Sequence, residues 1–137
     1  MKRIFSTSTP PVATNFAALA LRLTAGGFML SHGVPKLQRV LAGDFQFADP
    51  LGLSPEVSLV LAVFAEFLCS VLVILGLGTR LAAIPLMVTM AVAAFIAHGA
   101  DPFGRKELAL FYLVAFIVIL LLGGGKYSVD QIISKKK

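Results

Sequence analysis

The sequence predicts an all-α integral membrane protein, folded as a bundle of four membrane-spanning helices. Of its 137 residues, 58% are hydrophobic and only 14% are charged, whereas a soluble domain is about half apolar and about a quarter charged. The apolar residues also lie in four long runs. With their flanks, these runs reach the roughly 20 residues that cross the hydrocarbon of a bilayer. The predicted spans are residues 15–34, 55–76, 79–98 and 106–123.

The segments between the runs have the composition of turns and tails. Gly76 and Gly78 predict a tight turn between the second and third spans, and the glycines at 123–125 predict the end of the fourth. Residues 1–14 are expected to form an N-terminal tail, and residues 126–137 a basic amphipathic tail. In the long first connection, residues 35–41 could form a separate amphipathic helix on the membrane surface.

The positive charges predict that both termini lie in the cytoplasm. Four spans place the termini on one side, and lysine and arginine residues favour the cytoplasmic side. Seven such residues lie on the side of the termini: Lys2, Arg3, Arg80, Lys126, Lys135, Lys136 and Lys137. We therefore expect a multi-pass protein of a bacterial inner (cytoplasmic) membrane, with the lipid bilayer as its partner. The net charge of +5 then reflects topology and not nucleic-acid binding.

Two charged residues lie inside the predicted spans. Glu66 is the tenth of the nineteen residues 57–75, and Arg22 lies in the first span. Charges in a membrane are costly, and they usually face the bundle interior and pair. At 1.5 Å per residue, the two residues are expected at similar depths. We therefore predict an Arg22–Glu66 ion pair, which could be a packing lock without chemistry or could leave Glu66 to handle protons or contact a ligand.

Helical phase predicts which neighbours share a face with these two charges. At 100° per residue, Arg22 lies on a stripe with Gly26, Met29, Gly33 and, if the helix runs on past residue 34, Lys36; Glu66 lies on one with Leu59, Ala62, Ser70 and Val73. Small residues beside each charge would allow the two helices to approach closely. The two stripes are therefore expected to face each other.

A second polar cluster is expected at the outer end of the bundle. His32 and His98 end the first and third spans, Lys36 lies one turn beyond His32, and Tyr112 lies nearby in the fourth span. These groups could hold a quinone or another redox-active small molecule in a mostly apolar pocket, or could be interfacial residues without a ligand. Two histidines without another haem motif argue against haem, and a metal site needs more ligands. No catalytic residue and no metal site is predicted, and the candidates for ligand binding or proton handling are Arg22, His32, Lys36, Glu66, His98 and Tyr112.

Several short stretches, taken in order, resemble the DoxX family of small four-helix membrane proteins. They are Arg22 with Gly26 and Gly27, HGVPKL from His32, AEF and LGLGTR between Ala65 and Arg80, His98, and GGGKYSVD from Gly123. The last reads GGGKYS where GPGxYS is more usual in the family. By position, the resemblance marks Arg22, His32, Lys36, Glu66, Arg80 and His98 as the family-like polar residues.

The resemblance implies a link to redox metabolism, because relatives are described as subunits of thiosulfate:quinone oxidoreductase or as membrane partners of superoxide-detoxifying and thiol-handling enzymes. We therefore interpret the chain as a membrane component of an oxidoreductase system. In this interpretation it acts on a quinone, a reduced-sulfur compound or a thiol compound, together with a redox partner protein. A dithiol mechanism does not carry over, since Cys69 is the single cysteine. The alternative is a non-catalytic scaffold, chaperone or small-molecule permease with a structural Arg–Glu pair. Whether the chain is itself an enzyme, and whether it forms a homo-oligomer, stays open.

Overall fold

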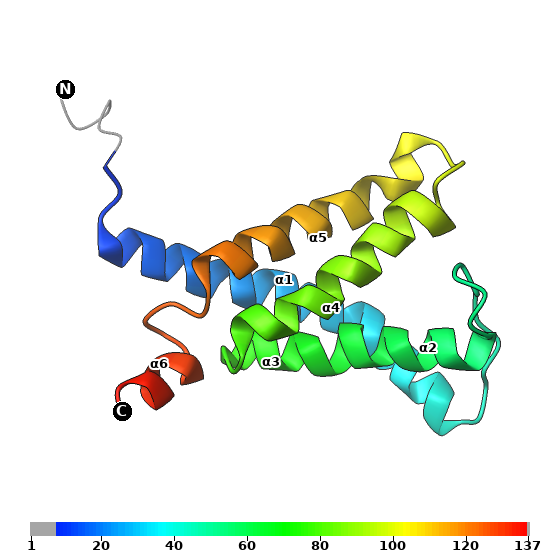
Figure 1. The fold of residues 1–137 in the computed structure, drawn as a ribbon, viewed down its shortest axis with the longest axis horizontal. Helices are drawn as coiled ribbons and strands as arrows, with labels where there is room; N and C mark the ends of the chain where they lie inside the picture. The colour runs from blue at the N-terminus through cyan, green and yellow to red at the C-terminus, as the bar shows by residue number, and fades with distance from the viewer. Residues whose placement is uncertain (1–7, 137) are drawn as a thin grey trace.

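The computed structural model describes residues 8–136, and this part of the chain is built from helices joined by turns and loops (Figure 1). The all-α prediction is therefore confirmed. The elements are α1 (Pro11–Leu41), α2 (Pro55–Val63), the π-helical η1 (Phe64–Cys69), α3 (Ser70–Leu75), α4 (Thr79–Val92), the π-helical η2 (Ala93–Ala97), α5 (Phe103–Leu122) and α6 (Val129–Ser134).

Several of these elements continue one another. Residues Pro55–Leu75 form a single helix with η1 as its middle section, and Thr79–Ala97 form another that ends with η2. Ser54 caps the first of these by accepting a hydrogen bond from the backbone N–H of Val57 (3.3 Å). Gly76 ends it in the left-handed conformation at φ 71°, which costs glycine least. The predicted tight turn between the second and third long helices is thus present.

The bundle has two distinct ends (Figure 1). At the first, which we call the tail end, lie the start of α1, the turn from α3 to α4, the end of α5, and α6. At the other, which we call the loop end, lie the end of α1, the start of α2 and the connection from η2 to α5. Which end faces the cytoplasm stays a prediction from the charges.

Three helical stretches within residues 8–136 are long and apolar enough to cross a membrane: Pro11–Leu41, Pro55–Leu75 and Thr79–Ala97. They correspond to the first three predicted spans. The fourth falls on α5, whose first five residues include Arg105, Lys106 and Glu107. The uncharged remainder, residues 108–122, is about 22 Å long at 1.5 Å per residue, shorter than the roughly 30 Å of hydrocarbon. A fourth crossing therefore stays a prediction.

The first helix is longer than the sequence suggested. It runs for 31 residues through Pro35 to Leu41, so residues 35–41 are its last two turns and not a separate surface helix. Proline lacks an N–H and disfavours a helix interior, which is why a break there was expected. Because α1 continues, Lys36 is carried on the same rigid helix as Arg22.

The α1 helix packs against the second long helix through the two predicted stripes. Arg22, Gly26, Met29 and Gly33 are all buried on α1, and Leu59, Ala62, Glu66, Ser70 and Val73 are buried opposite. Gly33 lies so close that a Cβ there would overlap the backbone of Glu66 and Phe67. Close backbone contact at small residues is typical of membrane helices. The expectation that the stripes face each other is confirmed.

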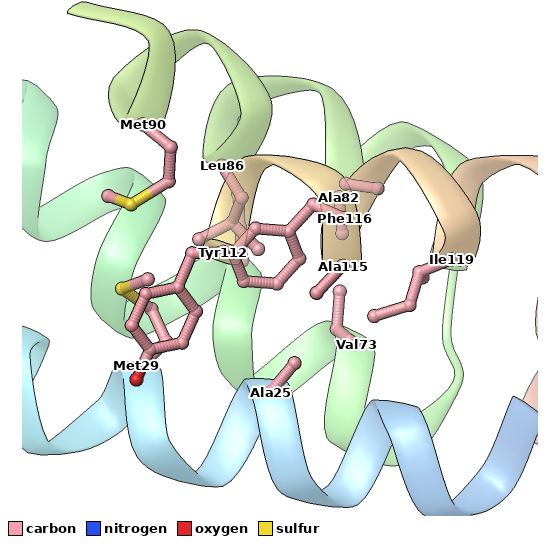
Figure 2. Close-up of a cluster of buried hydrophobic side chains, with 12 residues drawn as sticks. Ala25, Met29, Val73, Ala82, Leu86, Met90, Tyr112, Ala115, Phe116 and Ile119 are labelled. Carbon is pink, nitrogen blue, oxygen red and sulfur yellow. The ribbon is translucent and has the colours of Figure 1, made fainter. Parts of the chain in front are cut away.

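A continuous apolar core fills the middle of the bundle. Figure 2 shows side chains from α1, α3, α4 and α5 converging there, with Phe116 at the centre. Phe116, Leu86 and Val73 are completely buried. Since this core separates the loop end from the tail end, polar groups on either side of it form two separate sites.

Candidate functional site

A cavity of about 240 Å³ opens at the loop end of the core. Five of the six sequence-predicted candidates line it: His32, Lys36, Glu66, His98 and Tyr112. Arg105 adds a further polar side chain, and Met29, Met90, Ala93, Leu108 and Ala109 form the apolar part of the wall. The cavity thus combines six polar or charged side chains with five apolar residues, and converging polar groups beside an apolar wall can orient a small molecule.

Lys36 and Glu66 form an ion pair in this cavity. The Lys36 Nζ lies 2.5 Å from Oε2 of Glu66. The side chain of Glu66 is 7% exposed and that of Lys36 is 23% exposed, so the pair is largely shielded from solvent. Lys36 also donates to the carbonyl oxygen of His32 at 3.4 Å. The carboxylate in the middle of the second long helix therefore has a cationic partner on α1.

The predicted Arg22–Glu66 ion pair is wrong, and the register of the two helices explains why. Gly33 is the α1 residue level with Glu66, and Arg22 lies 11 residues before it, about 16 Å along the axis. Helical side chains also lean toward the N-terminus of their own helix. Lys36 therefore leans back toward Glu66, whereas Arg22 leans away from it.

Arg22 instead binds backbone carbonyls at the tail end. Its guanidinium donates to Val73 (3.1 Å), Ile74 (3.3 Å) and Tyr127 (3.0 and 3.1 Å), and to Gly124. Val73 and Ile74 lie in the last turn of α3, where carbonyls lack intrahelical partners and a positive charge is favourable. Arg22 is only 1% exposed. Its role is to join α1, the end of α3 and the segment after α5.

Asp130 completes this joint from the other side. Its two carboxylate oxygens accept hydrogen bonds from the backbone N–H of Gly78 (2.7 Å) and from the N–H (3.0 Å) and hydroxyl (2.7 Å) of Thr79, which caps the start of α4. Burial alone would raise the pKa of Asp130. The hydrogen bonds from Thr79 and Gly78, with the charge of Arg22, outweigh burial and hold that pKa below its usual value.

At the loop end, a carboxylate fixes the orientation of His98. Its Nδ1 lies 2.7 Å from Oδ2 of Asp101, and Nη1 of Arg105 lies 3.9 Å from the same oxygen. The hydrogen bond with His98 holds the pKa of Asp101 below its usual value, and the charge of Arg105 acts in the same direction. With Nδ1 engaged, Nε2 is the ring nitrogen left to bond a ligand.

Tyr112 connects the cavity to the core. Its ring stacks with Phe116 at a centroid distance of 6.1 Å and meets the ring of His32 edge-on at 5.9 Å. Figure 2 shows the Tyr112 hydroxyl pointing toward α1, beside Met29. Tyr112 is 7% exposed, so its hydroxyl lies on the inner side of the cavity.

The two π-helical segments lie beside this site. Glu66 lies within η1, and η2 ends one residue before His98. Such segments are rare and are frequent at functional sites. Hydrophobic periodicity does not distinguish a π-helix from an α-helix, so the sequence did not indicate them.

The structure also identifies residues that were not among the predicted site residues. Asp101 and Arg105 support His98. Asp101 follows His98 by three positions and Arg105 follows Asp101 by four, and these spacings could have indicated the contacts. The contacts of Asp130 were not foreseen, because they join positions 51 and 52 residues apart. Within residues 8–136, no group of three or more His, Cys, Asp or Glu side chains is placed to hold a metal ion.

Comparison with known proteins shows what the chain is similar to. The DoxX family model matches residues 17–99. An uncharacterized membrane protein of Mycobacterium tuberculosis is 28% identical over 98% of this chain and 88% of its own length. An uncharacterized protein of Haemophilus influenzae is 32% identical over 85% of this chain and 90% of its own length. No solved structure matches the chain.

Proposed function

The chain belongs to the DoxX family, and we propose that it is the membrane component of an oxidoreductase system. In this proposal, a quinone or a reduced-sulfur compound binds in the loop-end cavity, and a partner protein supplies the redox centre. The observation that carries the proposal is the convergence of His32, Lys36, Glu66, His98 and Tyr112 on one cavity.

The polar groups of the cavity match the chemistry of such ligands. A quinone head group has an apolar ring and two carbonyl oxygens, which accept hydrogen bonds. Tyr112 and His98 can donate to these oxygens, while Met29 and Leu108 cover the ring face. An anionic sulfur compound would instead meet the positive charges of Lys36 and Arg105.

The size of the cavity limits the ligand. Its volume of about 240 Å³ is below the roughly 300–1,000 Å³ of pockets for drug-sized molecules. A single ring or a small inorganic anion fits this volume, whereas a macrocycle such as haem is too large. This supports the expectation of a quinone or small sulfur compound over haem.

The Lys36–Glu66 pair gives the site a means of handling protons. A ligand that binds Lys36 weakens the ion pair, and the Glu66 carboxylate is then the acceptor for a proton from a ligand hydroxyl or thiol. His98, held through Nδ1 by Asp101, offers a second ring nitrogen for the same purpose. Transfer of electrons to or from the ligand is assigned to the partner protein.

The non-catalytic alternative is favoured by one observation, the structural role of Arg22, but two others count against it. Arg22 is wholly engaged with backbone carbonyls at the tail end, so this intramembrane charge is accounted for by structure. Glu66, however, faces the cavity, and the structural Arg–Glu pair on which that alternative relied is absent. A permease would also need a path through the core around Phe116, which is closely packed.

The test begins with the full chain purified in mild detergent. Mass spectrometry of extracted small molecules and of co-purifying proteins should find a quinone-class or sulfur compound and a redox partner. A Tyr112→Phe variant should lower ligand retention, whereas the matched Tyr127→Phe variant at the tail end should not, since Tyr127 lies outside the cavity. If neither a redox partner nor such a ligand is found, and added quinone and thiosulfate both fail to bind, the proposal is wrong.

A further inference from the structure

A second, larger cleft lies at the tail end, separated from the loop-end cavity by the apolar core. It has a volume of about 710 Å³, is open to the surroundings, and lies between the start of α1, the start of α4, the end of α5 and α6. We propose that this cleft binds the headgroup of an anionic phospholipid, with its phosphate held by Arg80, Lys126 and Lys135. The proposal does not depend on the function proposed for the loop-end cavity.

The charges of the cleft favour an anion. Arg80, Lys126 and Lys135 come from three different segments and all line it. Within the described residues, none of the three forms an ion pair. The single acid of the lining, Asp130, is already engaged by Gly78 and Thr79. The cleft therefore keeps a positive charge for a phosphate to neutralise.

A glycine leaves room for the Arg80 side chain at the cleft. Its Nη2 donates to the carbonyl oxygen of Leu121 at 3.4 Å, so the guanidinium lies across the end of α5. A Cβ at Gly123 would come within 3.1 Å of the Arg80 Nε, tighter than ordinary contact. Gly123 therefore leaves room for Arg80 at the border between the helix ends and the cleft, where the remaining guanidinium donors can bind phosphate.

The apolar border of the cleft identifies the ligand as a lipid and not a soluble phosphate. Leu81 and Leu122 line the cleft beside the charged groups, and Leu81 is 75% exposed. On a helix long and apolar enough to cross a membrane, such a side chain faces acyl chains. Basic residues beside the end of a membrane helix are typical of sites for anionic headgroups.

The experiment compares lipids on the full chain in nanodiscs or detergent, with native mass spectrometry or lipid titration as the readout. Phosphatidylglycerol should bind more tightly than phosphatidylcholine with the same acyl chains. Replacing Lys126 or Lys135 by glutamine should weaken phosphatidylglycerol binding about fivefold each, from the contribution of one basic residue near a charged surface. Because neither lysine side chain forms an ion pair with any residue in the described range 8–136, both variants should remain folded, which circular dichroism checks.

The matched control is Lys136→Gln. Lys136 has the same charge on the same tail but does not line the cleft, so this variant should retain wild-type binding. Equal loss in Lys136→Gln and Lys135→Gln would show general attraction to an anionic surface and overturn the specific site. Equal binding of the two lipids by the wild type would also overturn it. Displacement of phosphatidylglycerol by millimolar glycerol phosphate would assign the cleft to a soluble phosphate and not to a lipid.

Discussion

Lys36 and Glu66 provide a direct test of the loop-end site, because removing each partner should have a different cost. A Lys36→Met variant keeps the length of the apolar stem but leaves the Glu66 carboxylate buried, since Lys36 is the one side-chain hydrogen-bond partner that Glu66 has among the described residues. Breaking a buried ion pair in this way costs about 3 to 5 kcal/mol. We expect about 3 kcal/mol, the lower end of this range, because the pair borders a cavity and is not completely buried.

The reverse replacement should cost less. In Glu66→Gln the amide oxygen can still accept from Lys36, whose flexible side chain is 23% exposed and can move toward solvent. We expect a loss of about 1 kcal/mol, typical of one hydrogen bond. The double variant Lys36→Met/Glu66→Gln should recover most of the loss seen in Lys36→Met, because no charge then remains buried.

The assay is unfolding in detergent, followed by the helical circular dichroism signal because the chain contains no tryptophan. The order of stability should be wild type, Glu66→Gln, the double variant, and Lys36→Met. A Lys36→Met variant as stable as the wild type, or a Glu66→Gln variant less stable than Lys36→Met, would refute the argument from an unpaired buried carboxylate.

The other predictions concern helix packing and the tail end. Gly33→Ala should destabilise the protein by more than 1 kcal/mol, because its Cβ would overlap the backbone of Glu66. The matched Gly27→Ala variant, with no atom within 4 Å of its Cβ, should be neutral or stabilising in the same unfolding assay. Because the folded state lowers the pKa of Asp130, its contribution should be present above the ordinary carboxyl pKa of about 3.9 and lost as the pH falls through the lowered value. Asp130→Asn should lack this contribution at pH 6, and its difference in stability from the wild type should shrink as the pH falls below that ordinary pKa, as unfolding at several acidic pH values would show. Arg22→Met should cost about 3 kcal/mol or more through unpaired carbonyls, and its effect should add to that of Glu66→Gln; strong coupling between the two would contradict the separation of their sites.

Local pattern was enough to predict most of the fold. Long apolar runs and glycine turns predicted the helices, and a 100° rotation per residue predicted that Gly26, Met29 and Gly33 face Leu59, Ala62 and Ser70. These features depend on neighbours within a few turns of one helix. His32, Lys36, His98 and Tyr112 could be expected near one another, because each lies near the same end of its helix. Glu66 was expected at mid-depth with Arg22, and only the structure places it in the loop-end cavity.

Partners across the bundle were harder to predict. Depth was counted from assumed helix ends, and α1 begins at Pro11, earlier than expected. The sequence prediction also did not consider that helical side chains lean toward the N-terminus of their own helix. This lean moves the charge of Lys36 toward Glu66 and the charge of Arg22 away from it. The partners of Arg22 are carbonyl oxygens, which every residue carries, so no sequence pattern could have identified them.

The joint around Arg22 has a consequence for how the protein assembles. Two of its carbonyl partners, Gly124 and Tyr127, follow Arg22 by 102 and 105 positions. At a synthesis rate of about 5 to 20 residues per second, they leave the ribosome roughly 5 to 20 seconds after Arg22. During that interval the guanidinium must be satisfied by water or lipid headgroups near the membrane border. The α1 helix is therefore made well before two of its partners, and it obtains its complete set of contacts only once the segment after α5 has been translated.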